Sequence, residues 1–249
     1  MSLMDEFKEE RDSIKHAPFK KKLEYFLDYY KWHTMGALFI LFAIGIFIFT
    51  ASKSTETVLY AMFFNTDREE VFDEEMGNDF LAYAGIEDDR QEALIDTSYR
   101  LSSDSSQSGV ETTYQKLSIF TETSQLDVLG GSMECINICM YNAYLRDLRT
   151  ILTEAQLEKY EPYFLYADEA LLTARQEAAK NSEEYELIYP DPAKPEEMET
   201  PIPVAIDVSK CEKIQKIYPD CTETIAVGVS IGTIQEENVQ LFIDYLFEK

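Results

Sequence analysis

The chain has 249 residues and is strongly acidic, since 47 Asp and Glu against 22 Lys and Arg give a formal net charge of -25 at pH 7. This balance excludes a nucleic-acid-binding role, which needs basic surface to neutralise phosphates. Hydrophobic residues make up 45% of the chain and aromatic residues 13%, so a folded domain is expected rather than a disordered acidic stalk.

Residues 1–34 predict a small cytoplasmic tail. They carry seven acidic and seven basic groups, so the whole net charge belongs to the rest of the chain. After Pro18, apolar side chains recur at helical spacing among lysines, at Leu23, Phe26, Leu27 and Tyr30. This pattern is typical of an amphipathic helix lying at the inner surface of a membrane.

Residues 35–51 read MGALFILFAIGIFIFTA and contain no charged residue. Extended back to Trp32, the run reaches about 20 residues, which covers a hydrocarbon core of about 30 Å. We therefore predict a single transmembrane helix rather than a buried helix of a soluble core, which is usually amphipathic. Five lysines shortly before the run, against only Lys53 after it up to residue 67, place the N-terminus in the cytoplasm and the C-terminus outside.

A cleaved secretory signal is the alternative interpretation of this run, because Thr50, Ala51 and Ser52 are small enough for a processing site. The 34 residues before the run are longer than an ordinary n-region and carry many acidic groups. These features favour an uncleaved anchor. Residues 52–249 are then predicted to form an extracytoplasmic α/β domain.

The first half of this domain predicts alternating strands and helices. Strands are predicted at 57–65, 93–99 and 126–129, and helices at 66–83 and 110–123. The first of these helices begins at a capping box, Thr66 to Glu69. The order strand, helix, strand, helix, strand favours a mainly parallel sheet covered by helices on both faces.

The second half is less regular. Residues 145–175 are predicted to be largely helical or irregular, and the Pro- and Glu-rich segment 190–203 to be an exposed loop. Further strands are predicted at 185–189, 204–206 and 225–231, and helices at 209–218 and 236–247.

All four cysteines follow the apolar run. Cys211 and Cys221 are the more plausible disulfide pair, because nine intervening residues permit a helix and a return turn. Cys135 and Cys139 have neither the spacing of a metal knuckle nor that of a redox motif, which favours buried free thiols. Both histidines lie within residues 1–34, so a zinc site using histidine is excluded from the outer domain.

Several segments resemble the type II periplasmic-binding-protein fold of extracellular solute-binding proteins. They are 126–129 after an amphipathic helix, 145–148 followed by 157–160, 203–207, and the closing strand and helix 227–247. More narrowly, the chain is similar to uncharacterised membrane-anchored members from Gram-positive bacteria of the clostridial type, whose basic and aromatic lead-in resembles Leu23 to His33. The resemblance implies two α/β lobes with a ligand cleft between them.

Ligands of open α/β sheets bind outside the carboxyl ends of the parallel strands. The residues predicted to lie at these ends are Asn65, Thr66 and Asp67 after the first strand, Tyr99 after the second, and Gly130, Gly131 and Ser132 after the third. The glycines let the backbone approach a ligand closely, and a following helix offers free amide groups to an anion. Ordinary turns and caps use the same residue types, so both interpretations stay open.

Catalytic and metal-binding patterns are missing from the sequence. The outer domain has no histidine to act as a base, and no nucleophile elbow, phosphate-binding loop or zinc signature occurs. The acidic cluster within residues 67–79 lacks the pattern of a calcium loop and is typical of a solvated helix face. We therefore expect no enzymatic activity, no cofactor and no bound metal.

Two functions remain. The leading expectation is a membrane-tethered, extracytoplasmic binding protein that captures a small molecule or peptide in an interlobe cleft. The alternative is a structural or assembly component of a cell-envelope membrane complex that has lost ligand binding. A lipid bilayer around residues 35–51 is expected in both cases, and a membrane protein partner in the second.

Overall fold

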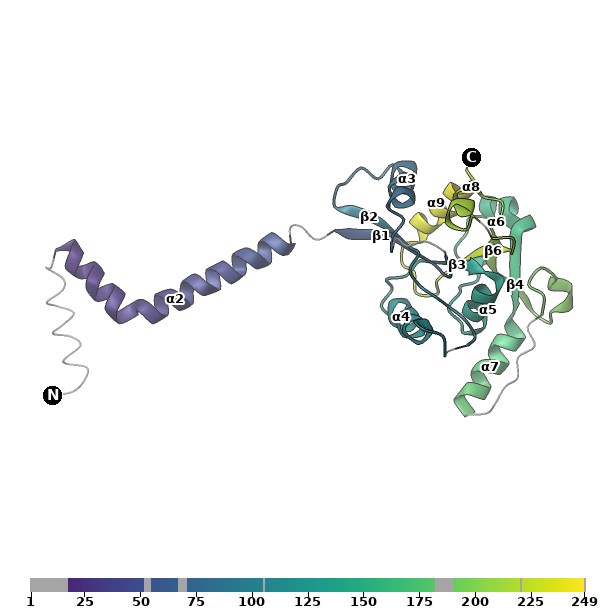
Figure 1. The fold of residues 1–249 in the computed structure, drawn as a ribbon, viewed down its shortest axis with the longest axis horizontal. Coiled ribbons are helices and arrows are strands. Elements are labelled where there is room, and N and C mark those ends of the chain that lie inside the picture. The colour runs from purple at the N-terminus through teal and green to yellow at the C-terminus, as the bar shows by residue number, and fades with distance from the viewer. Residues whose placement is uncertain are drawn as a thin grey trace. The chain divides into compact units, whose positions relative to one another are not determined.

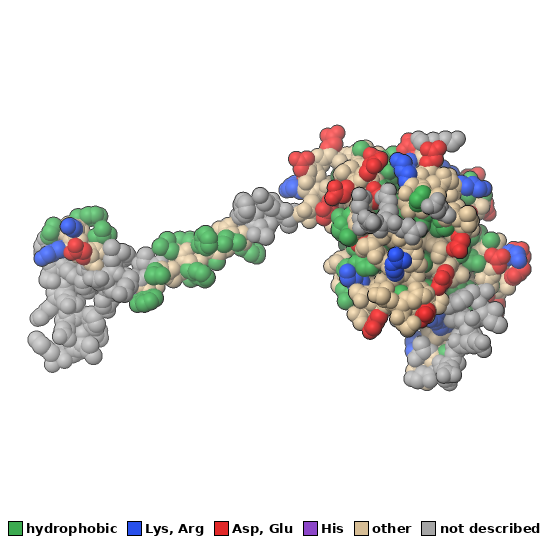
Figure 2. Space-filling model, viewed as in Figure 1, with side chains coloured by type: hydrophobic (Ala, Val, Ile, Leu, Met, Phe, Trp, Pro, Cys, Tyr) green, Lys and Arg blue, Asp and Glu red, His purple; other side chains and the backbone are tan. Residues whose placement is uncertain are grey.

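The computed structural model describes residues 18–51, 55–66, 71–104, 106–181, 190–219 and 221–248, and the chain divides into two compact units, Met1–Ser54 and Thr55–Lys249. In the described part of the first unit, residues 19–51 form one long helix, α2 (Phe19–Ala51). Many of its apolar side chains are exposed, among them Leu38, Phe39 and Phe47 (Figure 2). Among the described residues, no helix combines the length and the apolarity needed to cross a membrane.

The second unit is built on one mixed six-stranded sheet. Its strands are β1 (Glu56–Phe63), β2 (Gln91–Asp96), β3 (Val128–Ser132), β4 (Phe164–Asp168), β5 (Pro201–Asp207) and β6 (Ile225–Val229). Their spatial order is β2-β1-β3-β6-β5-β4. Strands β2, β1 and β3 are parallel, whereas β6 is antiparallel to both β3 and β5, and β4 is antiparallel to β5. The mainly parallel sheet that the sequence predicts is therefore correct only for the first three strands.

Helices cover both faces of this sheet, as predicted, and form an α/β fold (Figure 1). One face, called the α9 face below, packs against α3 (Glu74–Ala84), α6 (Glu154–Tyr160), α8 (Glu212–Ile217) and α9 (Glu236–Phe247). The other face, called the α5 face, packs against α4 (Val110–Glu122), α5 (Met133–Tyr141) and α7 (Glu169–Asn181). The sheet therefore separates two hydrophobic cores.

Strand β1 lies between β2 and β3 and is buried on both sides. Its residues from Val58 to Phe63 are all buried, which explains the nearly continuous apolar run in the sequence. Because side chains alternate along a strand, Leu59 and Phe63 enter the core of the α9 face, whereas Tyr60 and Met62 enter that of the α5 face.

Three predictions about this unit are wrong. Its strands form one sheet in one compact unit, so it does not separate into two lobes. Strand β4 lies in a segment predicted to be helical or irregular. Helix α3 begins at Glu74 rather than at Thr66, because Asp73 accepts a 3.0 Å hydrogen bond from the backbone N–H of Met76 and caps the helix there. The capping-box residues 67–69 and the predicted strand 185–189 lie outside the described residues.

The two outer edges of the sheet are each covered in part. Beside β2, Asp73 N–H donates to the oxygen of Ile95, and Val71 accepts from Thr97 N–H. Helix α3 approaches the same edge so closely that a Cβ on Gly77 would lie 2.4 Å from the oxygen of Ala93. Beside β4, Tyr166 N–H donates to the oxygen of Pro192. Some of the outward backbone groups at both edges thus have partners within the chain.

Candidate functional site

The segments that follow β1 and β2 meet, as the sequence predicts for the carboxyl ends of parallel strands. Asn65 N–H donates to the oxygen of Tyr99 over 2.9 Å, and Thr66 Oγ1 donates to the oxygen of Thr97 over 2.7 Å. Asp67 lies outside the described residues. The region around these contacts is called the strand-end region below.

Asn65 uses its side chain to hold the chain together. Its Nδ2 donates to the oxygen of Leu101 over 2.7 Å, and its Oδ1 accepts from the backbone N–H of Leu101 over 3.0 Å. The residue has a φ of 56°, a left-handed conformation that asparagine tolerates better than most residues. Its amide is therefore engaged by the backbone rather than presented to a ligand.

Gly130, Gly131 and Ser132 do not follow β3 but belong to it. They pair with Val227, Ala226 and Ile225, because the antiparallel neighbour β6 extends the ladder beyond the predicted end of the strand. A Cβ on Gly130 would lie 2.5 Å from the ring of Phe63, so the missing side chain gives that ring its space. The structure thus gives Gly130 a packing role.

Among the residues that the structure describes, buried side chains of the protein occupy the strand-end region. Cys135 lies beneath it, with its sulfur 3.1 Å from Asn65 Nδ2 and 3.6 Å from Ser132 Oγ. Burial raises the pKa of the Cys135 thiol to about 11, so it stays protonated at neutral pH. Above β1, the hydroxyl of Tyr218 donates to the oxygen of Phe64 over 2.7 Å.

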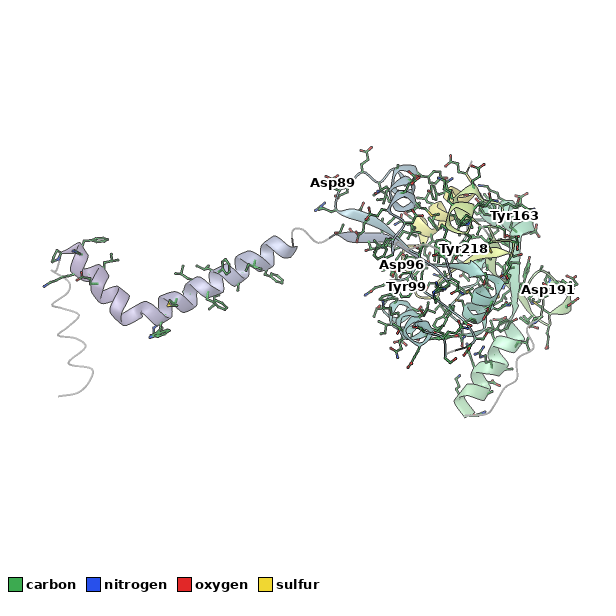
Figure 3. The ribbon with its side chains drawn as sticks, viewed as in Figure 1. Asp89, Asp96, Tyr99, Tyr163, Asp191 and Tyr218 are labelled. Atoms are coloured by element: carbon green, nitrogen blue, oxygen red, sulfur yellow. The ribbon has the colours of Figure 1, made fainter. Side chains whose placement is uncertain are left out.

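A polar network that the sequence analysis missed lies beside this region (Figure 3). The carboxylate of Asp96, 2% exposed, accepts from the hydroxyl of Tyr60 over 3.0 Å and from the N–H and hydroxyl of Ser98. Lys116 Nζ donates to the Tyr99 hydroxyl over 2.7 Å and lies 4.7 Å from the centre of the Tyr99 ring. The network therefore fastens the end of β2 to β1 and positions Tyr99 against α4.

The electrostatics of this network do not favour proton transfer. Burial, followed by the nearby charge of Asp96, raises the pKa of Tyr60 far above its usual value. A phenol held protonated in this way donates a hydrogen bond but supplies no base. The partners of Tyr60 come from distant parts of the chain, so the sequence around Tyr60 does not predict them.

An open hollow lies at the carboxyl end of β5, which runs in the same direction as β1. It has a volume of about 260 Å³ and is lined by Tyr163, Asp207, Lys210, Cys211, Glu212, Leu246, Phe247 and Glu248. Small-molecule sites usually occupy about 300–1,000 Å³, so this hollow falls just below that range. Burial raises the pKa of the Cys211 thiol to about 11, which makes it a poor nucleophile.

A second, shallower groove lies next to it on the α9 face and is called the aromatic groove below. Its volume is about 420 Å³, and it is lined by Arg149, Leu157, Glu158, Glu161, Phe164, Tyr166, Pro201 and Pro203. Neither hollow contains a residue that the sequence predicts as ligand-binding. Within the described ranges, no group of three His, Cys, Asp or Glu side chains is arranged to hold a metal ion.

The four cysteines are free thiols. Cys135 and Cys139 are buried, which confirms the expectation for that pair. Cys211 is buried and Cys221 exposed, and no disulfide joins them, so the predicted pairing is wrong in this structure. The N–H of Cys221 instead bonds to the oxygen of Tyr218, at the turn after α8.

In comparisons with known proteins, no family model matches the chain, and no curated protein or solved structure matches it either. The resemblance to solute-binding proteins therefore stays a prediction from short sequence segments. What the structure assigns to the chain is a mixed α/β fold with one six-stranded sheet.

Proposed function

We propose that the chain is a membrane-tethered, non-enzymatic component of a cell-envelope complex, whose outer α/β domain binds a partner protein through its surface. The observation that carries this proposal is the filled strand-end region. Open α/β sheets bind small molecules at the ends of parallel strands, and there the chain packs its own side chains. Phe63 occupies the space beside Gly130, and Tyr218 covers the end of β1.

The internal use of polar groups supports the same conclusion. A binding site keeps some donors and acceptors available to its ligand. Asn65 and Thr66 instead bond to backbone oxygens of the chain, and Tyr99 accepts from Lys116. An assembly component needs this region only to be rigid, and the observed contacts provide rigidity.

The tether is supported by the uncharged run 35–51 and by the distribution of charge. In α2, side chains such as Leu38, Phe39 and Phe42 are more than half exposed, and side chains of this kind favour a non-aqueous environment or a protein surface around them. Lysines cluster before the run, and the net charge of -25 follows it. This asymmetry supports a cytoplasmic N-terminus and an extracytoplasmic domain.

Capture of a small molecule is the second candidate, and the hollow lined by Tyr163 and Phe247 favours it. The hollow lies at the end of a strand and has an aromatic wall with carboxylates around it. Its volume of about 260 Å³ suits only a small ligand. Such a ligand would bind at β5 rather than in the strand-end region.

Chemical cross-linking of cells that express the tagged full chain tests the proposal. Purification in detergent is expected to recover a membrane protein partner in a fixed ratio. If the chain is instead recovered alone, while an amino acid, sugar or peptide raises its unfolding free energy, the second candidate replaces the proposal. A ligand at about 100 times its dissociation constant adds about 2.7 kcal/mol.

Cys221 provides a native probe of membrane topology, because its thiol is exposed and the other three are buried. A membrane-impermeant maleimide added to intact cells is expected to label the chain, and a Cys221→Ser variant to stay unlabelled. Labelling of the unsubstituted chain only after lysis would place the domain inside the cell and contradict the tether as proposed.

A further inference from the structure

Among the described residues, the helices of the α9 face cover the outer end of the sheet only in part, since Phe164 and Tyr166 of β4 are half-buried. Strand β4 sends Leu165 and Ala167 into the core of the α5 face, whereas Phe164 and Tyr166 line the aromatic groove on the opposite face. Pro201 and Pro203 of the neighbouring strand β5 line the same groove. Its floor is thus made of two aromatic rings and two proline rings.

A second pair of aromatic rings lines the neighbouring hollow. Tyr163 directly precedes β4, lines the hollow at the end of β5, and is 38% exposed. Its ring centre lies 5.1 Å from that of Phe247, and the centres of Phe164 and Tyr166 lie 6.5 Å apart. The four residues Phe247, Tyr163, Phe164 and Tyr166 are called the aromatic strip below.

Carboxylates border the aromatic strip on both sides. Glu158 and Glu161 line the groove and are exposed, and the hollow adds the acidic residues Asp207, Glu212 and Glu248 together with the basic residue Lys210. Burial raises the pKa of Tyr166, the negative charge of Glu161 raises it further, and the positive charge of Arg149 opposes the rise, so both charges act on the floor of the groove. The rim is therefore mainly negative.

The cation in the groove is paired with a neighbouring carboxylate. Arg149 Nη2 lies 2.6 Å from Asp147 Oδ2, and Arg149 Nε lies 3.0 Å from both oxygens of that carboxylate. The Asp147 carboxylate offsets part of the guanidinium charge, and Glu158 and Glu161 add two negative charges to the groove. An acidic ligand is thus disfavoured, and a cationic one is favoured.

We propose that the aromatic strip binds an extended, proline-containing segment of a partner protein that carries Lys or Arg side chains. Proline-rich segments are pre-ordered and dock on aromatic floors, and cations bind over aromatic rings beside carboxylates. A second copy of this domain is disfavoured because it shares the strong negative charge. This inference rests on the proposed function, since it names the chemistry of the partner.

Fluorescence anisotropy with the full chain in detergent micelles tests the inference. The probe is a labelled peptide of alternating proline and lysine. We expect Glu158→Gln combined with Glu161→Gln to weaken its binding at least roughly tenfold. The matched control, Glu111→Gln combined with Glu177→Gln, removes two exposed carboxylates from α4 and α7 on the α5 face and should change the affinity less than about twofold.

A second pair of peptides separates site binding from general charge attraction. A peptide of alternating glycine and lysine keeps the charge and loses the pre-ordered backbone, so it should bind at least roughly fivefold more weakly. A Tyr166→Leu variant should bind the two peptides with more similar affinities, because it loses the contact between the tyrosine ring and the proline rings of the first peptide. Thermal unfolding of each variant checks that the fold is intact.

Equal weakening by the groove variant and the control would overturn the inference, because it would mean that only the overall charge matters. No binding to the unsubstituted chain at about 1 mM peptide would also overturn it. In that case recovery of a cross-linked membrane partner would leave the proposed function standing. If the peptide binds at the groove but no partner is ever cross-linked, the proposed function fails instead.

Discussion

The hydroxyl of Tyr218 donates a 2.7 Å hydrogen bond to the backbone oxygen of Phe64, a residue 154 positions earlier in the chain. Tyr218 directly follows the last residue of α8, and Phe64 directly follows the last residue of β1. The contact is buried, and the ring of Tyr218 also packs edge-on against that of Phe63. One residue from the second half of the domain thus covers the end of the strand that the sequence marks as a ligand site.

Tyr218→Phe should destabilise the domain. The variant keeps the ring but removes the donor from a buried oxygen, which costs about 1–3 kcal/mol of unfolding free energy. Urea unfolding of the full chain in detergent, followed by circular dichroism, measures the loss. Tyr163→Phe removes a hydroxyl from an exposed ring and should cost less than about 0.5 kcal/mol. Similar losses in the two variants would contradict the importance of the Phe64 contact.

Gly130→Ala should also destabilise the domain, because the new methyl group would lie 2.5 Å from the ring of Phe63. Overpacking of this kind costs about 1–3 kcal/mol. The same unfolding measurement on Gly130→Ala combined with Phe63→Leu should give a total loss smaller than the sum of the single losses, because the smaller side chain vacates the space. A stable Gly130→Ala protein would favour the alternative in which the glycine serves close approach of a ligand.

Asp127 should make the free energy of unfolding of the domain fall as pH rises. Burial raises its pKa, although hydrogen bonds from Thr233 and from the N–H of Tyr60 oppose the shift. Since the folded-state pKa lies above the unfolded value of about 3.9, the folded state holds more protons between the two values. The contribution of Asp127 to the free energy of unfolding is therefore fully present below the pKa of the unfolded state. It is lost as pH rises through the pKa of the folded state.

Comparison with Asp127→Asn isolates that slope, because the variant cannot ionise at this position. The unfolding free energy of the unsubstituted chain, minus that of the variant, should fall as pH rises from about 3 to about 7. Urea titrations of both proteins at matched pH values supply the difference. A difference that rises with pH would mean that the native contacts favour the carboxylate over the acid.

In the native protein, a thiol reagent should react much faster with Cys221 than with the other three cysteines. Cys221 is exposed, whereas Cys135, Cys139 and Cys211 are buried. A pKa of about 11 leaves only about one Cys211 in a thousand as thiolate at pH 8. In the native protein, one thiol should react rapidly with a thiol reagent, and Cys221→Ser should abolish this phase. After unfolding without a reductant, four thiols should react, whereas two would indicate a disulfide.

The sequence predicts best those elements whose apolar periodicity matches their burial. Helix α9 was expected at 236–247 and occupies Glu236–Phe247, with Val239, Phe242 and Leu246 on its buried side. Helix α4 was expected at 110–123 and occupies Val110–Glu122. Such patterns are local, so they can be recognised in the sequence without knowledge of the tertiary structure.

Strand direction and strand ends depend on neighbours that the sequence does not reveal. Gly130 and Gly131 look like a turn, yet pairing with β6 keeps them extended. Strand β4, with the sequence FLYAD, is short and lies between helices, so it has no distinctive period. The antiparallel half of the sheet was missed for the same reason, because chain direction is set by packing rather than by local composition.

The sequence predicts where the candidate site lies, but it does not predict that side chains of the protein itself fill it. The rule for parallel strands correctly brings Asn65 close to Tyr99, and it brings Thr66 close to Thr97, two residues before Tyr99. Whether the resulting space is open depends on residues such as Tyr218, which are distant in sequence. The Asp96 network was missed because each of its members is ordinary in its own segment.

The covered edges of the sheet bear on how copies of this chain behave when they are crowded together. A bare edge offers its backbone groups to any extended segment, whatever the sequence of that segment, and can recruit copy after copy into fibres. Here Pro192 takes up a backbone group of one edge, and Val71 and Asp73 take up backbone groups of the other. These contacts leave fewer free backbone groups for a strand of a neighbouring copy, which disfavours association through the sheet edges.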